Sequence, residues 1–296
     1  MLEKFPVIRG WLARWDYKKK REELLKSYTH FLQSVTVTSI RQVKFDSRGC
    51  IYVLKDGREF LFDPEKSAGW LYTIPTSGTF EEKETEYLRR AIKPGWTCLD
   101  VGACFGWYSI LFSQLVGSEG KVHSFEPVPD NRECLERNIE LNNAGNIQVN
   151  SFALGAEPGI SKIYVPNDGV SGSLRAHTKT KDCSVIDIDI STLDHYIYDN
   201  ALEGIDFIKA DIEGAEMLML QGAEEALKKY RPMLMLEVQA HSTKHFGYEP
   251  KELFSWLQKL GYQSYFVDSN YELISCGHLL DDKLLPDYNF IFISQS

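Results

Sequence analysis

Two glycines and one acidic residue form the first group of residues that could do chemistry. The stretch TCLDVGACFGWYS, residues 97–109, places Gly102 and Gly106 four residues apart behind a short apolar run. Glycine has no Cβ, so the chain can turn sharply here and a ligand can approach the backbone closely. Glu126 lies 24 residues past Gly102, where an acidic side chain can accept hydrogen bonds from both hydroxyls of a ribose. The spacing predicts a nucleoside-binding site.

The same turn lacks a glycine that dinucleotide binding requires. A dinucleotide turn follows the pattern GxGxxG, and Ala103 and Cys104 stand where its next glycine is needed. The sequence therefore favours a nucleoside ligand without a pyrophosphate over NAD.

A second group of polar residues follows later apolar runs. Four charges fall within eight residues between Lys209 and Glu216, at the end of the run IDFI. Burying such charges is costly unless they are paired or used. A positioned general base accelerates the reaction of a weak nucleophile by ~10²- to 10⁴-fold. The candidate catalytic residues are Lys209, Asp211, Glu213, Glu237 and His241.

Other interpretations of these residues stay open. Acids are favoured in the first turn of a helix, so Asp211 and Glu213 could only complement the helix dipole. Asp211, Glu213 and Glu237 could instead hold Mg²⁺, which prefers oxygen ligands and would acidify a bound hydroxyl. His241 and His245 have the spacing of metal ligands on a helix, although a solvated pair in a loop is the simpler interpretation.

These residues need a scaffold that brings strand ends together. From Phe80 onward, apolar strand-like runs alternate with helix-length segments, which predicts a doubly wound, mostly parallel α/β sheet. Such sheets bind ligands at the carboxyl ends of their strands, and the candidate residues lie directly after the runs. Residues 156–191 interrupt the pattern and predict an inserted β excursion and a candidate lid.

The N-terminal region predicts a small α+β appendage over residues 1–80, ahead of a main domain over residues 81–296. Asp56-Gly57 joins two apolar runs, which is a strong hairpin signal. The first 30 residues hold eight basic and four acidic residues beside Trp11 and Trp15. This pattern fits a surface helix packed on the main domain or on a second subunit, or an amphipathic helix on an anionic membrane.

Composition narrows the class of protein. The chain has 296 residues, 43% of them hydrophobic, and a net charge of −9, which argues against a nucleic-acid partner. No apolar run approaches the ~20 residues that cross a bilayer, and the N-terminus lacks the features of a signal peptide. The six cysteines are scattered without a CxxC pair, which favours reduced thiols. We expect a cytoplasmic protein.

Several stretches in order along the chain resemble the FkbM-type S-adenosylmethionine-dependent methyltransferases. The resemblance covers residues from about 80 to 268, and its most particular block is DFIKADIEGAE. The other blocks are LDVGACFGWYS, FEPVPDNRECLERNIELNN, ALG, STLD and RPMLMLEV. One departure is Cys104, where the family often has Asn.

The resemblance implies a class I methyltransferase fold with a Rossmann-like sheet of seven strands, the last of them antiparallel. It also implies S-adenosyl-L-methionine as cofactor and methyl transfer to a hydroxyl of a sugar, a glycan or a secondary metabolite. The residues expected to bind the cofactor are Asp100, Gly102, Ala103, Cys104, Gly106, Trp107, Tyr108, Glu126, Pro127, Ala153 and Asp211.

Two other functions remain as alternatives. The first is a different nucleotide-dependent enzyme such as a dehydrogenase, which the missing glycine disfavours. The second is a cofactor-binding adaptor without catalysis that acts through its N-terminal region. Binding of S-adenosylmethionine rather than NAD would distinguish the first alternative, and turnover on an acceptor would exclude the second.

Overall fold

The computed structural model describes residues 39–62, 80–166, 183–277 and 287–295. The helix predicted over the first 30 residues lies outside this part of the chain, so its membrane or subunit contact stays a prediction. Within the described residues, no helix is both long enough and apolar enough to span a membrane.

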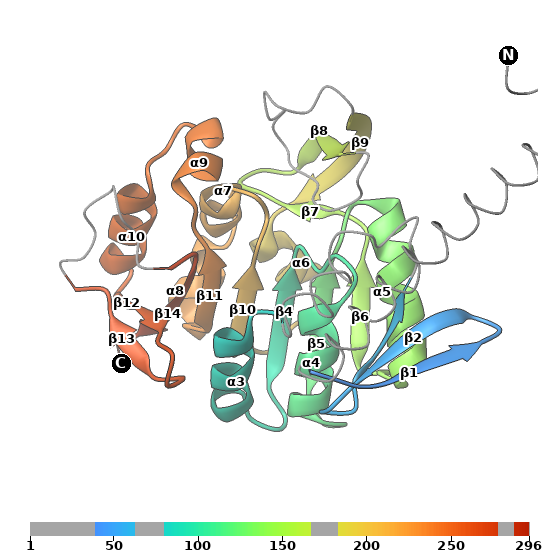
Figure 1. The fold of residues 1–296 in the computed structure, drawn as a ribbon. Helices are drawn as coiled ribbons and strands as arrows, with labels where there is room; N and C mark the ends of the chain where they lie inside the picture. Colours follow the sequence, from blue (N-terminus) through green and yellow to red (C-terminus); the bar gives the residue numbers. More distant parts are fainter. Residues whose placement is uncertain (1–38, 63–79, 167–182, 278–286, 296) are drawn as a thin grey trace, which may run out of the picture.

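An eight-stranded sheet forms the centre of the molecule, in the order β13-β12-β14-β11-β10-β4-β5-β6 (Figure 1). Strands β6, β5, β4, β10 and β11 are parallel to one another, and β14 runs antiparallel to both β11 and β12. The strands are β4 (Thr97–Val101), β5 (Lys121–Phe125), β6 (Ile147–Asn150), β10 (Phe207–Ala210), β11 (Met233–Glu237), β12 (Tyr262–Val267), β13 (Leu273–Ser275) and β14 (Asn289–Ser294).

The seven strands expected from the sequence are confirmed, with the last of them antiparallel. The eighth, β13, is a three-residue edge strand that turns back on β12. The turn between them is held by Asp268, whose carboxylate accepts hydrogen bonds from the backbone N–H groups of Asn270 and Glu272. A strand this short carries no apolar pattern of its own, which is why the sequence did not predict it.

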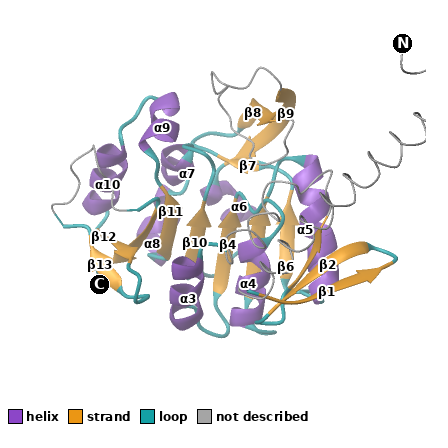
Figure 2. Ribbon diagram, in the orientation of Figure 1, coloured by secondary structure: helices purple, strands orange, loops and turns teal. Residues whose placement is uncertain are grey.

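Helices cover both faces of the sheet, as the alternation of runs predicts (Figure 2). Two hydrophobic cores result, one on each face. The first face carries α6 (Leu193–Asp199), α7 (Glu216–Gln221), α8 (Glu224–Tyr230) and α10 (Pro250–Lys259), and the second carries α3 (Glu82–Ala91), α4 (Trp107–Val116) and α5 (Pro129–Asn142). Short α9 (Ala240–Thr243) and the 3-10 turn η2 (Lys244–Phe246) follow β11. The doubly wound α/β class is confirmed.

A three-stranded antiparallel sheet precedes the main sheet, formed by β1 (Ile40–Asp46), β2 (Gly49–Leu54) and β3 (Glu59–Phe62). The hairpin predicted at Asp56-Gly57 joins β2 to β3, whereas β1 was not expected. Buried side chains of this sheet, including Tyr52 and Phe60, pack in the same core as Leu88 of α3 and Trp107 of α4. The described part of the N-terminal region therefore rests on the face formed by α3, α4 and α5. A domain boundary at residue 80 stays a prediction.

The β excursion is present as β8 (Gly159–Pro166) and β9 (Cys183–Ser191), an antiparallel pair that β7 (Ala153–Leu154) joins along β9. In Figure 1 this small sheet lies beyond the arrowheads of β4 and β10, at the carboxyl edge of the main sheet. Residues 167–182 lie outside the described part of the chain, so a lid function stays a prediction.

Candidate active site

The turn between β4 and α4 is built on Gly102. Its φ of +82° lies in the left-handed region, and a Cβ added there would lie 2.1 Å from the backbone oxygen of Asp211. The N–H groups of Gly102 and Ala103 both donate to the carbonyl of Phe125, at 3.0 and 3.1 Å. The turn is thus held between the ends of β5 and β10, and Gly102 allows the close contact with β10.

Glu126 lies at the end of β5 with its carboxylate against this turn. The N–H of Cys104 donates to one carboxylate oxygen at 2.8 Å, and the N–H of Val128 donates to the other at 2.8 Å. Cys104 reaches this position with a φ of +49°, unusual for a residue other than glycine. Burial raises the pKa of Glu126 to about 7, although both backbone hydrogen bonds lower it.

One cavity joins the ends of β4, β5 and β10. Six of the residues expected to bind the cofactor line it: Gly102, Cys104, Glu126, Pro127, Ala153 and Asp211. Its other walls are largely apolar. Val128, Ile163 of β8 and Ile188 of β9 line the cavity and form a buried cluster of their own, which links the small sheet to the loop after β5. These three residues could not be predicted from the sequence, because only the fold brings them into contact.

The other five expected residues do not line this cavity. Ala103 is buried and takes part through its backbone, whereas Gly106 makes room for Leu135 of α5, whose side chain would lie 2.6 Å from an added Cβ. Asp100 is buried beneath the turn and accepts a hydrogen bond of 2.5 Å from the hydroxyl of Ser109. The hydroxyl of Tyr108 donates to Glu81.

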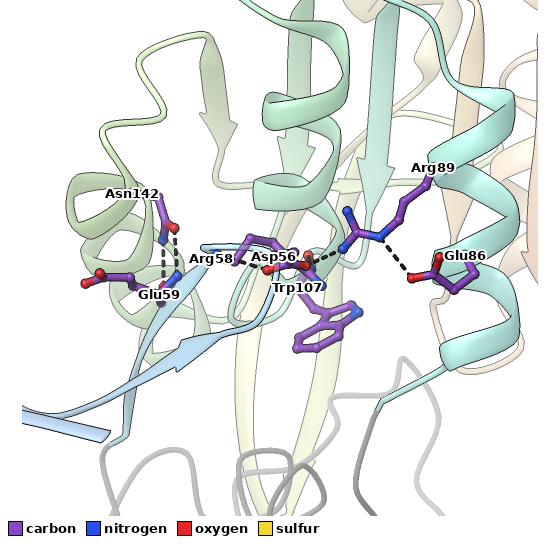
Figure 3. Close-up of polar contacts among 7 residues, drawn as sticks. All are labelled: Asp56, Arg58, Glu59, Glu86, Arg89, Trp107 and Asn142. Carbon is purple, nitrogen blue, oxygen red and sulfur yellow. Dashed lines mark hydrogen bonds and ion pairs between the residues drawn. The ribbon is translucent and has the colours of Figure 1, made fainter. Parts of the chain in front are cut away.

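The expectation that Trp107 binds the cofactor is corrected by the position of its side chain. The indole is 4% exposed and stacks on Phe60 of β3, with 5.3 Å between ring centres and 21° between planes. Figure 3 shows the indole beside Arg58 of the hairpin. Trp107 is therefore a core residue that joins α4 to the N-terminal sheet.

The charged residues in the last part of β10 and in the loop after it occupy distinct positions. Asp211 and Glu213 line the cavity, and the ammonium of Lys209 lies 3.1 Å from Asp211 Oδ2. Burial lowers the pKa of Lys209, but Asp211, Asp100 and Glu81 more than offset this and raise it above its ordinary value. The raised pKa favours the charged form of Lys209, which makes it a counter-ion of Asp211, and a catalytic role for it stays a prediction.

Glu237 at the end of β11 forms a pair with Asp211. Burial, then the negative charge of Asp211 and a hydrogen bond with it, raise the pKa of Glu237 to about 10. Gln239 donates a further hydrogen bond to Glu237 at 2.5 Å. The raised pKa favours the protonated form of Glu237 at neutral pH.

Glu216 is the last of the four charged residues between Lys209 and Glu216, and its contacts are structural. It is fully buried, and its Oε1 accepts hydrogen bonds from the N–H groups of Ile212 and Gly214, at 3.0 and 3.3 Å. The carboxylate fixes the loop that carries Asp211 and Glu213 to the cavity. Glu216 is therefore a structural member of the motif.

The described residues do not fit a metal site. His241 lies exposed on α9 and does not line the cavity. Across the ranges that the structure covers, no three His, Cys, Asp or Glu side chains come together in an arrangement that could hold an ion. The Mg²⁺ option for Asp211, Glu213 and Glu237 therefore has no support in this geometry.

The family is decided by a match over residues 100–264 to the model of the methyltransferase FkbM domain, which spans more than half of the chain. The chain belongs to the FkbM methyltransferase family. The expected resemblance is thus confirmed, and this FkbM protein carries the matched segment from the glycine turn to β12.

Curated relatives of this FkbM protein are methyltransferases. It is 24% identical over 145 residues to Methyltransferase 1 of Beauveria bassiana, covering 43% of this chain and 58% of that protein. It is 26% identical over 156 residues to Methyltransferase sdnD of Sordaria araneosa, covering 43% of this chain and 60% of the relative. The chain thus spans about three fifths of the length of these relatives.

This FkbM protein is also distantly similar to methyltransferases of known structure. A methyltransferase FkbM from Methylobacillus flagellatus is 17% identical, with a TM-score of 0.42, over 92% of this chain and 60% of that one. A methyltransferase from Streptococcus mutans in complex with SAH is 11% identical, with a TM-score of 0.42, over 72% of this chain and 97% of that one.

Proposed function

We propose that this FkbM protein is an S-adenosylmethionine-dependent O-methyltransferase that acts on a hydroxyl of a sugar, a glycan or a secondary metabolite. One observation carries the proposal: the carboxylate of Glu126 and that of Asp211 line a single cavity, on either side of the Gly102 turn. The first suits a ribose and the second suits the acceptor hydroxyl.

The residues of the cavity fit the cofactor. A carboxylate has about four acceptor positions, and the backbone N–H groups of Cys104 and Val128 occupy two of those on Glu126. The side chain of Asn131, which also lines the cavity, makes a third hydrogen bond to Glu126, so a ribose hydroxyl can use the position that is left and compete with Asn131 for another. The apolar wall formed by Val128, Ile163 and Ile188 suits the base. When bound, the cofactor would supply a methyl group that is already activated as part of a sulfonium.

The proton of the acceptor is the part of the reaction that falls to the chain itself. Asp211 is the carboxylate nearest to Lys209, and Glu237 donates its shared proton to it. These contacts hold Asp211 in one orientation at the cavity wall, where it can take the proton of an alcohol as the new bond forms. Glu213 lines the same cavity and is the second candidate for this role.

Transfer of a labelled methyl group from S-adenosylmethionine to a panel of hydroxylated acceptors tests this proposal. The panel contains simple sugars, a glycan and phenolic or alcoholic metabolites, each also tested as its O-methylated derivative, which lacks the free hydroxyl. We expect transfer to at least one free hydroxyl by the full chain and a loss of ~10²-fold or more in Asp211→Asn. Binding of the cofactor without transfer to any acceptor would favour an adaptor, and binding of NAD in its place would favour a dehydrogenase.

A further inference from the structure

Another cavity lies at the edge of the main sheet opposite to the Gly102 turn. It has a volume of about 310 Å³ and lies at the amino ends of β5 and β6. Lys121 and His123 of β5 and Gln148 of β6 line it, together with residues that follow α6. The reaction proposed above uses none of these side chains, so the cavity has no assigned ligand.

His123 brings an unsatisfied polar atom to this cavity. The residue is 3% exposed, and its Nδ1 lies 2.8 Å from the hydroxyl oxygen of Tyr196 on α6. Its Nε2 is buried and has no hydrogen-bond partner among the described residues. A buried polar atom without a partner costs free energy. A ligand atom in the adjoining cavity would remove that cost.

The hydrogen bonds of Tyr196 decide which chemistry His123 offers. Burial raises the pKa of Tyr196, while a hydrogen bond with the Asn150 side chain lowers it, as a bond donated to the phenol oxygen does. The hydroxyl proton of Tyr196 is then directed at His123 Nδ1. Burial and the charge of Lys121 lower the pKa of His123 to about 4, so the ring is neutral at pH 7. Its single proton therefore lies on Nε2, which is a donor in need of an acceptor.

The neighbours of His123 add further donors and a positive charge. Lys121 lies two residues before His123 on β5, so both side chains leave the same face of the sheet. Gln148 is paired with His123 in the register of β5 and β6. Among the described residues no Asp or Glu lines this cavity, although the chain has a net charge of −9. Donors and a cation without an acid favour an anionic oxygen as the ligand atom.

We propose that this cavity is a binding site for a small anion with oxygen acceptors, either a carboxylate or a phosphate. One oxygen of the ligand accepts the Nε2–H of His123, and the ammonium of Lys121 offsets its charge. Tyr196 is a positioning residue, because it sets the tautomer of the imidazole. The inference is independent of the proposed function, since it involves neither the cofactor nor the methyl acceptor.

Nuclear magnetic resonance titration of the ¹⁵N-labelled full chain tests the site. Inorganic phosphate and acetate are added separately, with sodium chloride of equal ionic strength as the blank. We expect at least one of them to cause saturable shifts of the His123 ring and of the backbone amides of Gly145 and Gln148, which line the cavity. His123→Phe should weaken binding by roughly 10-fold or more, and Lys121→Gln by roughly two- to fivefold, because Lys121 is exposed. Lys259→Gln, at an exposed position of α10, is the matched control and should change nothing.

The outcomes also identify the class of ligand. Saturation by phosphate alone assigns a phosphate group, saturation by acetate alone assigns a carboxylate, and saturation by both supports the oxygen chemistry that they share. No saturable shift with either anion, or equal affinity in a folded His123→Phe protein, would overturn the site. A free His123 ring with its proton on Nδ1 would overturn it as well. Should His123→Phe not fold, Tyr196→Phe keeps the imidazole but removes the hydroxyl that sets its tautomer, and it must also weaken binding.

Discussion

The guanidinium of Arg58 lies over the indole of Trp107, 4.1 Å from the ring centre, and its Nη1 donates a hydrogen bond of 2.9 Å to the Trp107 carbonyl (Figure 3). Trp107 is the first residue of α4. Asn138 of α5 connects the same regions, because its side chain donates to the carbonyl of Phe105 and accepts from the N–H of Leu61. The N-terminal hairpin thereby fixes the helix that follows the Gly102 turn.

Replacing Arg58 with Met should destabilise the protein. Arg58 is 1% exposed and pairs with Asp56 at 2.8 Å. Loss of a buried partner typically costs 3–5 kcal/mol, and we expect about 3 kcal/mol because Asp56 keeps its ion pair with Arg89. Chemical denaturation measures the change. Arg48 is the control. It forms an ion pair with Asp46, the aspartate two positions before it, just as Arg58 does with Asp56, but Arg48 is exposed. Arg48→Met should therefore have little effect on stability. Equal effects of both substitutions would contradict a buried clamp.

Gly102→Ala should damage both the fold and the site. The added Cβ would lie 2.1 Å from the backbone of Asp211, so β4 and β10 must move apart. Gly95 has a similar φ of +84°, but a Cβ there meets nothing within 4 Å. Gly95→Ala should therefore cost about 1 kcal/mol for the left-handed backbone, and Gly102→Ala roughly 1–3 kcal/mol more. Denaturation and cofactor titration of both variants check this. If the two variants were equally stable, the backbone around Gly102 would accommodate the added Cβ at little cost in free energy, which would contradict this prediction.

The alternation of apolar runs was enough to predict the fold class, the strand ends and the β2–β3 hairpin. These features depend on local pattern, and a parallel sheet then brings the strand ends to one edge. Strand β1 has a mostly exposed pattern, with only Ile40 fully buried, and β13 has three residues. Neither carries enough periodicity to be recognised before its partner strand is known.

The same distinction between local pattern and tertiary contact decides which residues of the candidate site could be predicted. That Gly102, Glu126 and Asp211 lie on one cavity could be predicted, because their spacing reflects backbone geometry within one strand–turn–helix unit or at neighbouring strand ends, while their roles stay predictions. The side chain of Trp107 lies in the core and not on the cavity, because Phe60 of β3 packs against its ring, and only the fold reveals this contact. Ile163 was missed because β8 brings it to the cavity through a contact that no local pattern encodes.

Glu237→Gln and Asp211→Asn should separate the two partners of the carboxyl pair. Since burial and Asp211 raise the pKa of Glu237 to about 10, the residue is a neutral donor at pH 7, and the amide of Gln can replace it. We expect Glu237→Gln to keep single-turnover methyl transfer within about tenfold, and Asp211→Asn to lose roughly 10²- to 10⁴-fold. In Asp211→Asn the rate should fall far more than the affinity for the cofactor. If Glu237→Gln instead lost far more of its methyl-transfer rate than Asp211→Asn, Glu237 would be the base.

Glu216 should make the stability of the free protein depend on pH. Burial raises its pKa from 4.5 to about 7, so the folded state holds a proton that the unfolded state releases. Unfolding free energy therefore falls as pH rises between about 4.5 and 7, by ~1.4 kcal/mol per pH unit for this group. Glu81 and Glu126 act in the same direction. Denaturation between pH 5 and 7 should give a shallower decline for Glu216→Gln than for the wild type. Parallel curves would assign the dependence to other groups.

Calorimetric titration of S-adenosylhomocysteine into the wild type and Glu126→Gln is the most direct test of the cofactor site. The control is Glu119→Gln, an exposed acid in the turn before β5. We predict binding to the wild type and to the control with equal affinity. Glu126→Gln should bind roughly 10- to 100-fold more weakly, because a hydrogen bond to a charged acceptor contributes about 1.5–3 kcal/mol. Wild-type affinity in a folded Glu126→Gln protein, or no binding by the wild type, would contradict a ribose site at Glu126.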